Sequence, residues 1–428
     1  MIRETRSVCP VCMRNLPARL IGRPDGSVQL EKTCPLHGSF SVPVWRGKRD
    51  FETWSAGSVP LPPGAGERCI GGCGLCGEHE TGSCCVLLEV TRRCDLRCRY
   101  CFADGGAADA DPPREALESA IRDIAARCGG PLLQLSGGEP TLRDDLPELV
   151  RCAKAAGCSY VQVNTNGLRL AREPDYARRL AEAGLDIVFL QFDGTRDDIF
   201  ECLRGGPLLE RKLEAVSVCA ALGLGVTLVP TVVRGVNDGD LGALVALAAS
   251  LSPGVRGVHF QPVSYFGRFP AAPEADGRYT LDELMDDLCR QTGIPADCLR
   301  PSRCDHPLCG FHAAFLIGAG SALQPLTTAV PPQGRSSARE NRDYVARRWM
   351  RGASEQKPAA AATDFDSFLY RVRHESLTLS AMAFQDAGNL NIERLHRCSL
   401  HVYDAGRIVP FCARYLSAMP SPAAGENE

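Results

Sequence analysis

The sequence contains no apolar run long enough to cross a membrane. The stretch ALVALAASL, at residues 243–251, is far shorter than the roughly 20 residues that a spanning helix needs. The first residues, MIRETRSVCPVC, lack the apolar segment that signal peptides carry. These absences predict a cytoplasmic protein with no transmembrane segment.

An excess of charge of either sign is also missing. The chain has 48 Lys and Arg against 51 Asp and Glu, which gives a formal net charge of -3, and the two signs are interspersed. Proteins that bind nucleic acid usually gather basic side chains on one face to contact phosphates. We therefore expect no nucleic-acid partner.

Cysteine, in contrast, is abundant. The chain has 22 cysteines among 428 residues, and many lie in short clusters. In a reducing compartment, clustered cysteines are typical of metal sites rather than of disulfides. A chain of this length can also bury a core large enough to need no disulfide framework. The sequence therefore predicts several metal centres.

Cysteine, proline and glycine divide the chain into segments. Residues 1–45 predict a unit like a zinc ribbon or rubredoxin, in which RPDG turns a hairpin and brings CPVC and CPLHG together. A Pro- and Gly-rich linker at 46–66 and an auxiliary iron–sulfur loop at 67–85 follow. A regular region covers 86–290, a cysteine-rich auxiliary-cluster region covers 291–420, and a disordered tail is expected at 421–428.

The N-terminal unit offers four metal ligands. Cys9, Cys12, Cys34 and His37 have the spacing of a tetrahedral site. Zinc is the expected metal, and mononuclear iron is the alternative.

Strands and helices alternate regularly between residues 86 and 290. Six short apolar segments alternate with segments of helical period; the apolar ones are CVLLEVT, PLLQLSG, YVQVNTNG, DIVFLQFDG, GVTLVPTVV and GVHFQPVS. Continuous apolar strands separated by helices indicate a parallel sheet covered by helices. The fold class is therefore α/β, as a partial (β/α)6 barrel of the TIM type. Its functional groups are expected at the carboxyl ends of the strands.

The loop after the first of these strands holds three closely spaced cysteines. Cys94, Cys98 and Cys101 lie in RRCDLRCRYC with the spacing C-x-x-x-C-x-x-C. A 4Fe–4S cubane takes four thiolates, so three from one loop leave one iron open to another ligand. An open coordination position usually indicates catalysis rather than a structural role.

This loop resembles the signature of the radical S-adenosylmethionine (SAM) superfamily, C-x-x-x-C-x-aromatic-C, with Tyr100 as the aromatic residue. The resemblance implies that SAM binds the open iron and is reductively cleaved. The product is a 5′-deoxyadenosyl radical that abstracts hydrogen from an unactivated carbon. It also implies that Cys94, Cys98 and Cys101 hold the catalytic cluster and that Tyr100 lies beside the adenine.

Three further motifs match the superfamily in order along the chain. SGGEP ends the second strand, where Gly137, Gly138 and Glu139 would hold the methionyl ammonium of SAM. Glycines there would let the main chain approach the ligand closely. NTNG and LQFDG end the next two strands and place four more residues near the ribose or the substrate: Thr165, Asn166, Gln191 and Asp193.

Two other cysteine groups predict auxiliary 4Fe–4S clusters. RCIGGCGLC repeats the three-cysteine spacing and is followed by a fourth thiol, so the expected ligands are Cys69, Cys73, Cys76 and Cys84, with zinc as the alternative metal. The later group lacks a fourth local ligand, for which Cys398 and Cys412 are the nearest candidates. The expected second set is Cys298, Cys304, Cys309 and Cys412.

The order of these segments narrows the resemblance to one branch of the superfamily. The chain looks like the branch of tetraether lipid synthase and class D pterin methylases, and is most similar to the bacterial radical SAM (seleno)proteins called TrsS. That resemblance implies carbon–carbon bond formation or methylation of a lipid-like or small-molecule substrate. It also implies auxiliary clusters that move electrons and a donor such as flavodoxin or ferredoxin. The alternative is a peptide-modifying maturase, because those enzymes also carry cysteine-rich extensions with auxiliary clusters.

Overall fold

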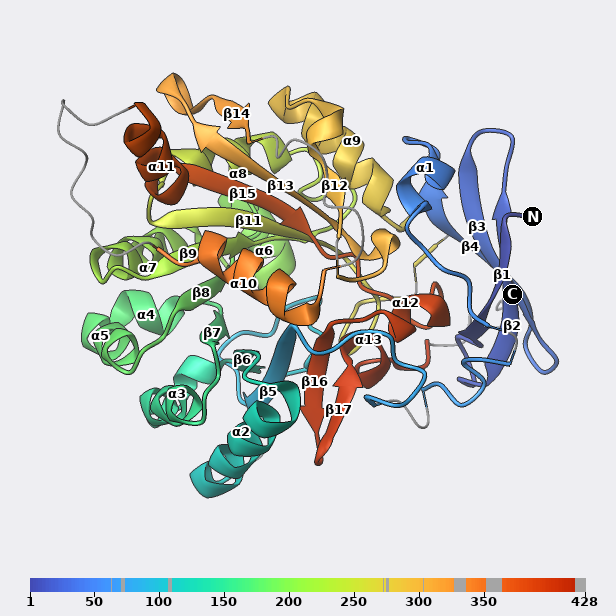
Figure 1. The fold of residues 1–428 in the computed structure, drawn as a ribbon, viewed down its shortest axis with the longest axis horizontal. Helices are drawn as coiled ribbons and strands as arrows, with labels where there is room; N and C mark the ends of the chain where they lie inside the picture. The colour runs from blue at the N-terminus through green and yellow to red at the C-terminus, as the bar shows by residue number, and fades with distance from the viewer. Residues whose placement is uncertain are drawn as a thin grey trace, which may run out of the picture.

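The computed structural model of the protein contains a small N-terminal sheet and a larger sheet built from the rest of the chain (Figure 1). It describes residues 1–62, 64–70, 74–106, 110–271, 273–274, 277–302, 304–326, 336–351 and 364–419. The expected tail at 421–428 lies outside these ranges. Among the helices of the described residues, none combines the length and apolarity that a membrane span requires.

The N-terminal residues form a small antiparallel sheet. Its four strands, in spatial as well as chain order, are β1 (Arg3–Val8), β2 (Asn15–Gly22), β3 (Ser27–Cys34) and β4 (Gly38–Arg46). The strands β2 and β3 pair around residues 23–26, so the structure contains the hairpin predicted at RPDG. The Asp25 carboxylate accepts a hydrogen bond from the Ser27 N–H at 2.9 Å and closes this turn.

Six parallel strands form the centre of the second sheet. They lie side by side in chain order: β5 (Cys85–Thr91), β6 (Leu132–Gly137), β7 (Tyr160–Thr165), β8 (Ile187–Gln191), β9 (Gly225–Val229) and β11 (Val255–Pro262). The short strand β10 (Thr231–Val232) pairs with β11. This arrangement confirms the predicted partial (β/α)6 barrel.

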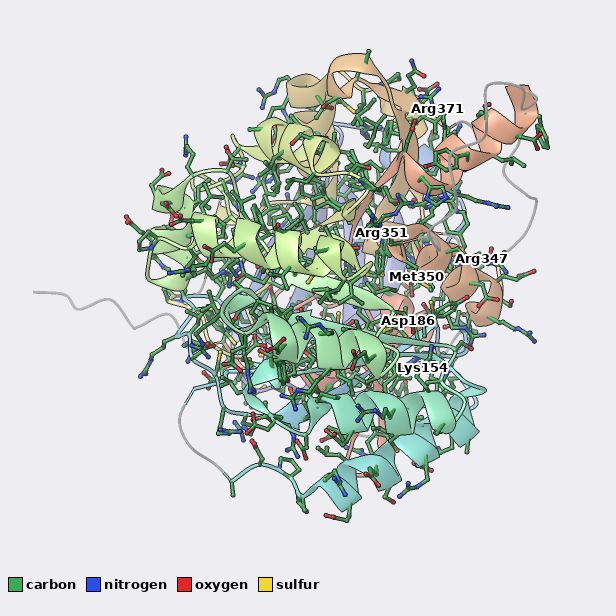
Figure 2. The ribbon with its side chains drawn as sticks, turned by 90° about the vertical axis from the view of Figure 1, so that its left-hand side faces the viewer. Lys154, Asp186, Arg347, Met350, Arg351 and Arg371 are labelled. Carbon is green, nitrogen blue, oxygen red and sulfur yellow. The ribbon has the colours of Figure 1, made fainter. Side chains whose placement is uncertain are left out.

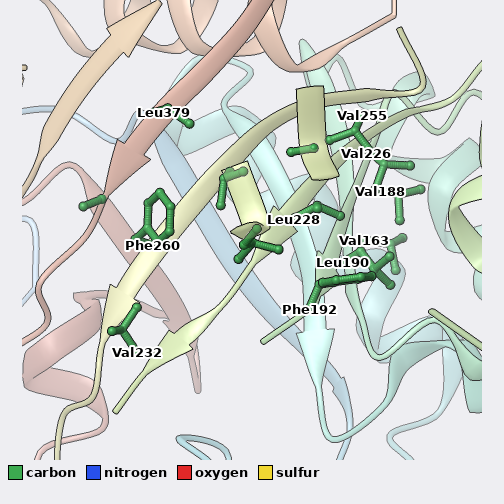
Figure 3. Close-up of a cluster of buried hydrophobic side chains, with 14 of the residues drawn as sticks. Val163, Val188, Leu190, Phe192, Val226, Leu228, Val232, Val255, Phe260 and Leu379 are labelled. Carbon is green, nitrogen blue, oxygen red and sulfur yellow. The ribbon is translucent and has the colours of Figure 1, made fainter. Parts of the chain in front are cut away.

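Helices between these strands cover the outer face of the sheet (Figure 1). They are α2 (Arg114–Cys128), α3 (Leu146–Ala155), α4 (Leu168–Arg172), α5 (Pro174–Glu182), α6 (Asp197–Arg204), α7 (Leu209–Ala221), α8 (Leu241–Ser250) and α9 (Leu281–Thr292). Valine, leucine and phenylalanine from several strands fill the space beneath them, as Figure 3 shows. Both faces of the central strands are covered, which explains their nearly continuous apolar sequences.

The C-terminal region does not form a separate unit but extends the barrel sheet at both edges. At one edge β15 (Ser376–Ala381) runs parallel to β11, followed by β13 (Phe311–Ile317), β12 (Arg300–Pro301) and β14 (Leu323–Pro325). At the other edge β16 (Leu400–Asp404) runs parallel to β5 and pairs with β17 (Arg407–Pro410). Strands from the predicted auxiliary-cluster region at 291–420 therefore belong to the barrel sheet, at both of its edges.

Helix α10 (Ala338–Trp349) crosses the beginning of the central strands. It packs in one cluster with the first residues of three strands, Leu132, Tyr160 and Ile187. The next residues, Met350 and Arg351, lie on the same side of the molecule as Lys154 and Asp186, which form an ion pair of 2.8 Å (Figure 2). Thus α10 occupies the amino-terminal end of the barrel, opposite the loops that carry the predicted motifs.

Further helices lie among the described C-terminal residues. They are α11 (Asp364–His374), α12 (Ile392–His396) and α13 (Phe411–Arg414). The last two lie between the barrel and the N-terminal sheet (Figure 1).

The predicted linker contains a short helix, α1 (Phe51–Ser55), and holds the two sheets together. The Asp50 side chain caps this helix, and Phe51 is buried against Trp45. The buried amine of Lys32 also donates hydrogen bonds to the carbonyls of Ala387 and Gly388, at 2.8 and 2.7 Å. The N-terminal sheet is therefore docked on the barrel by packed and hydrogen-bonded contacts.

Candidate active site

The three cysteines after β5 share one wall of a cavity. Cys94, Cys98 and Cys101 all line this cavity, which has a volume of about 310 Å³ and reaches into the barrel. The loop that carries them lies at the carboxyl end of β5, where parallel barrels place their catalytic groups. The structure therefore brings together the three thiols that the sequence assigned to one cluster.

A second loop braces this cluster loop. The Arg268 side chain donates to the carbonyls of Cys98 and Gly105 at 2.9 and 3.0 Å. The main chain of Arg268 also exchanges two hydrogen bonds with Cys101, at 3.0 and 2.9 Å. Backbone carbonyls and amides, rather than thiols, make these contacts, so the sulfur atoms stay available for a metal.

Glycine at position 267 is required for this brace. Gly267 has a φ of +63°, and a Cβ atom there would stand 2.4 Å from the Cys101 carbonyl oxygen and 2.5 Å from that of Phe102. A residue with a side chain would suffer backbone strain of roughly 1–2 kcal/mol together with this clash. Residue 267 is therefore fixed by the close approach of two loops.

We expect Gly267→Ala to lower the iron retained by the cluster loop, because the loop must move away from the added methyl group. Iron per chain after anaerobic reconstitution measures the loss. Gly206→Ala is the matched control, since a Cβ there meets nothing within 4 Å. Equal iron contents in the two variants would contradict this account of the loop.

The adjacent glycines of SGGEP pack against the cluster loop itself. A Cβ at Gly137 would stand 2.1 Å from the Thr91 carbonyl oxygen, and a Cβ at Gly138 would stand 2.1 Å from that of Arg93. The Gly138 and Glu139 N–H groups donate to the same two carbonyls, at 2.8 and 2.7 Å. The structure shows that these glycines make room for the main chain at the start of the cluster loop, and their predicted approach to a ligand stays a prediction.

Glu139 connects the ends of β6 and β7. Its Oε1 accepts hydrogen bonds from Thr141 N–H, Thr141 Oγ1 and Thr165 Oγ1 at 3.0, 2.6 and 2.6 Å. Its Oε2 accepts one bond, from Asn166 N–H at 2.6 Å. Burial raises the pKa of Glu139, and these donors oppose that shift. Oε1 is therefore saturated, whereas Oε2 has two lone pairs and one donor and keeps capacity for one further donor.

Asn166 ties the end of β7 to the cluster loop. Its side-chain NH2 group donates to the Asp95 carboxylate at 2.7 Å, and its main-chain carbonyl accepts from the buried Lys212 amine at 2.6 Å. Thr165 and Asn166 both line the cavity, and their predicted place near the ribose or the substrate stays a prediction. In this structure, however, their hydrogen bonds hold neighbouring loops in place.

Asp193 is buried and acts through an arginine that the sequence did not single out. It forms a two-pronged ion pair with Arg204, with Nε and Nη2 each 2.6 Å from a carboxylate oxygen. Both side chains are almost fully buried, at 0% and 5% exposure. Arg204 lines the cavity; burial lowers the pKa of its guanidinium, but the interactions with Asp193 and Cys98 outweigh burial and raise it. Asp193 therefore positions a cation beside the cluster loop.

Lys212 is a second buried cation beside this site. Its amine donates to the side-chain oxygen of Gln191 at 2.7 Å and to the Gln191 carbonyl at 2.9 Å. Burial lowers the pKa of Lys212 to about 8. Lys212 and Arg204 come from the helices after β8, and nothing in their sequence spacing distinguishes them from surface residues.

Tyr100 lies on the cavity wall between two cluster cysteines. It is half-buried, and its ring packs edge-on against Tyr265 with centroids 6.3 Å apart. Its predicted position beside a bound adenine stays a prediction.

Side-chain amides and aromatic rings line the deeper part of the cavity. The amides come from the strands and from α10: Gln134, Gln162, Asn164, Gln191, Gln261 and Asn341. Phe189, His259 and Trp349 form an aromatic wall with ring centroids 5.3–5.6 Å apart. Within the described chain, the charged lining residues are Glu139, Arg204 and Asp305, and each is already hydrogen-bonded to the protein.

The N-terminal sheet brings its four predicted ligands together. One ligand atom from each of Cys9, Cys12, Cys34 and His37 lies within 4.8 Å of all the others. The His37 Nδ1 atom is 3.6 Å from the Cys9 sulfur and 3.5 Å from the Cys34 sulfur. Ligand atoms this close fit a single tetrahedral ion such as zinc.

The first auxiliary loop is placed differently from the prediction. Cys69 lies within 4.8 Å of ligand atoms of Glu78 and His396. Cys84, in contrast, lines the barrel cavity, where its sulfur accepts a hydrogen bond from Asn341 at 3.5 Å. Cys76 is exposed, and Cys73 lies outside the described residues.

The second auxiliary group also differs in membership. Cys304, Cys309 and Cys412 are buried, as expected for ligands. Burial, and then the nearby Asp305, Cys412 and Cys309, raise the pKa of the Cys398 thiol well above its ordinary value. Cys298 lies apart, and its sulfur donates to the Pro295 carbonyl at 2.9 Å. The structure thus groups Cys398, rather than Cys298, with Cys309 and Cys412.

Comparison with known proteins agrees with this geometry. Residues 88–248 match the model of the radical SAM superfamily, and residues 1–46 match that of the HMPTM N-terminal zinc ribbon domain. The chain is 29% identical to 7,8-dihydro-6-hydroxymethylpterin dimethyltransferase of Methanocaldococcus jannaschii, over 96% of this chain and 93% of that protein. It is 28% identical to GTP 3′,8-cyclase of Limosilactobacillus fermentum, over 49% of this chain and 62% of that protein. Among solved structures, SuiB of Streptococcus suis matches with a TM-score of 0.41 and 16% identity, over 50% of this chain and 46% of that one.

Proposed function

Because the chain belongs to the radical SAM superfamily, we propose that it methylates an unactivated carbon of a small, uncharged, planar nitrogen heterocycle bound in the barrel cavity. The observation that carries this proposal is the row of amides and aromatic rings between the cluster loop and α10. The proposal joins that chemistry to the methylation activity stated in the name of the similar dimethyltransferase.

The residues of the cluster loop fit a SAM-binding 4Fe–4S cluster. Three thiols face one cavity, and a buried guanidinium stands beside one of them, where it would offset the negative charge of thiolate-bound iron. When bound, the cluster and SAM would supply a 5′-deoxyadenosyl radical able to abstract hydrogen from carbon. Cys94, Cys98 and Cys101 would hold the cluster, and the loops around Glu139 and Asn166 would position SAM.

The polarity of the cavity favours a heterocycle over a lipid tail. A hydrocarbon chain would cover several buried amides without offering them hydrogen bonds, at a cost of roughly 1–3 kcal/mol for each group left unpaired. A planar nitrogen heterocycle offers donors and acceptors at its edge and an apolar face for aromatic side chains. The walls of this cavity match that combination.

Gln162 is the amide most directly available to such a substrate. It is almost fully buried and lines the cavity, and its Nε2 donates to Gln134 at 3.1 Å. Its Oε1 is buried with no hydrogen-bond partner in the part of the chain that the structure describes. A donor on the heterocycle edge would satisfy this oxygen.

We propose in addition that auxiliary 4Fe–4S clusters move electrons between the active site and a donor such as flavodoxin or ferredoxin. The second auxiliary set would be Cys304, Cys309, Cys398 and Cys412, in which Cys398 replaces Cys298 for the reason given above. The first auxiliary centre is built on the loop of Cys69.

The decisive experiment is a turnover assay under anaerobic conditions. The reconstituted enzyme would be given SAM, a strong reductant, a methyl donor and a 6-hydroxymethyl-dihydropterin as the test heterocycle. We expect 5′-deoxyadenosine and a heterocycle heavier by one methylene unit for each methyl group added. Nucleoside formation with an unchanged heterocycle, and with a methylated lipid in a parallel assay, would overturn the proposed substrate.

We expect Gln162→Leu to raise the KM for the heterocycle about tenfold. A tenfold change in affinity corresponds to about 1.4 kcal/mol, which lies within the usual range for the loss of one buried hydrogen bond. SAM cleavage without substrate should stay unchanged, because Gln162 lies on β7 below the cluster loop. Gln324→Leu, on the exposed part of β14, is the matched control, and an unchanged KM in Gln162→Leu would contradict the assigned contact.

A further inference from the structure

The loop of Cys69 lies against the end of helix α12, far from it in sequence. The Cys69 sulfur is 3.1 Å from His396 Nε2, and a Glu78 carboxylate oxygen is 3.8 Å from the same nitrogen. These three ligand atoms lie within 4.8 Å of one another. His396 is more than 300 residues away in sequence from the loop that carries Cys69 and Glu78. The thiol, carboxylate and imidazole therefore meet because of the fold and not because of a local turn.

Hydrogen bonds hold the loop and the helix in this relation. The Glu80 N–H donates to the His396 carbonyl at 2.8 Å, and Thr81 Oγ1 donates to the Cys398 carbonyl at 2.8 Å. The Gly66 N–H donates to the Glu78 carboxylate at 3.1 Å. The His396 side chain is only 6% exposed, whereas Glu78 is half exposed. The imidazole is therefore the fixed, buried partner of the thiol.

We propose that His396 is an imidazole ligand of the metal centre held by Cys69. This assignment goes beyond the proposed reaction and replaces Cys84, which the sequence suggested as the fourth ligand of the loop. Cys84 cannot serve both places, because its sulfur lines the barrel cavity next to Asn341.

Imidazole and thiolate are ordinary partners around both zinc and iron. In a single zinc site, three or four such atoms surround one ion, and their separations resemble those seen here. In an iron–sulfur cluster, a neutral imidazole in place of a thiolate makes the centre less negative and raises its reduction potential. The shared chemistry is nitrogen ligation by His396, and counting acid-labile sulfide distinguishes a single ion from a cluster.

The test measures nitrogen ligation directly, in a His37→Cys background so that the N-terminal site contributes no imidazole. X-ray absorption at the iron and zinc edges of the anaerobically purified chain should show imidazole scattering. That signal should be lost in His37→Cys/His396→Cys and retained in the matched control His37→Cys/His374→Asn. His374 lies at the end of α11, away from the metal groups.

Cysteine rather than alanine is placed at position 396 because a thiol can still bind the metal, so the variant loses the imidazole without losing the metal. In the His396→Cys variant we expect the metal content to be retained, and any iron–sulfur cluster at this loop should titrate at a more negative potential. Imidazole scattering that persists without His396, or that is absent from the His37→Cys parent, would overturn the assignment. Neither result depends on methylation, so failure of the proposed function would leave this test intact.

Discussion

Replacing Cys98 with alanine is expected to abolish SAM cleavage while leaving iron at the auxiliary centres. Cys98 is one of only three thiols that its loop offers to a cubane, so its loss leaves two ligands for four irons. No other cysteine among the described residues of the loop can replace it. We therefore expect Cys98→Ala to prevent the 4Fe–4S cluster from binding to this loop, rather than to leave a bound but inactive cluster.

The measurement is 5′-deoxyadenosine formed under reducing conditions, together with iron per chain. We expect the nucleoside to fall below detection and iron to drop by about four atoms, the content of one cubane. Cys152→Ala is the matched control, because that half-buried thiol lies on α3 at the outer face of the barrel. Full cleavage activity in Cys98→Ala would show that another loop carries the catalytic cluster.

The second large effect is expected from Asp193→Ala, which should lower the free energy of unfolding by about 3–5 kcal/mol. Removal of one partner from a buried ion pair leaves an uncompensated charge, here the Arg204 guanidinium at 5% exposure. Thr231 N–H would also lose its acceptor, since it donates to the same carboxylate at 3.0 Å. Without Asp193 the Arg204 guanidinium would no longer be held in its position next to Cys98. Weaker retention of the cluster should therefore accompany the loss of stability.

Urea denaturation of the metal-loaded chain and its iron content measure the two effects. Asp198→Ala, on the helix that carries Arg204, is the matched control, because the pair of Asp198 with Arg196 is exposed at 67% and 59% and should contribute less than about 1 kcal/mol. A double variant, Asp193→Leu/Arg204→Met, should recover part of the stability without the cation beside Cys98. An Asp193→Ala chain that unfolds at the same urea concentration as the parent would refute this role of the pair.

Most of the barrel and its motifs could be predicted from the sequence because they are local. An apolar strand followed by a polar, Gly-bearing loop is visible in one short window, as in PLLQLSGGEP. Parallel strands then place such loops at one end of the sheet, which is why Cys94, Glu139 and Asn166 line the same cavity. The N-terminal metal ligands are equally local, since one hairpin joins CPVC to CPLHG.

The roles of SGGEP were predicted only in part. Its position at the end of β6 follows from the pattern, but the atoms that its glycines approach do not. The structure places the carbonyls of Thr91 and Arg93 there, on a different strand end. A close contact between two backbones leaves no mark in either segment beyond the glycine itself.

By itself, then, the sequence determined the class of fold and predicted the cluster loop and the four N-terminal metal ligands, because each is encoded by neighbouring residues. Only the tertiary structure decided that α10 closes the barrel, that Arg204 pairs with Asp193 and that His396 meets Cys69. It also placed the Cys398 thiol near Cys309 and Cys412, whereas the Cys298 thiol bonds to the Pro295 carbonyl. These contacts bridge long stretches of chain, and their partners are chosen by packing of the whole sheet, which spacing along the sequence does not record.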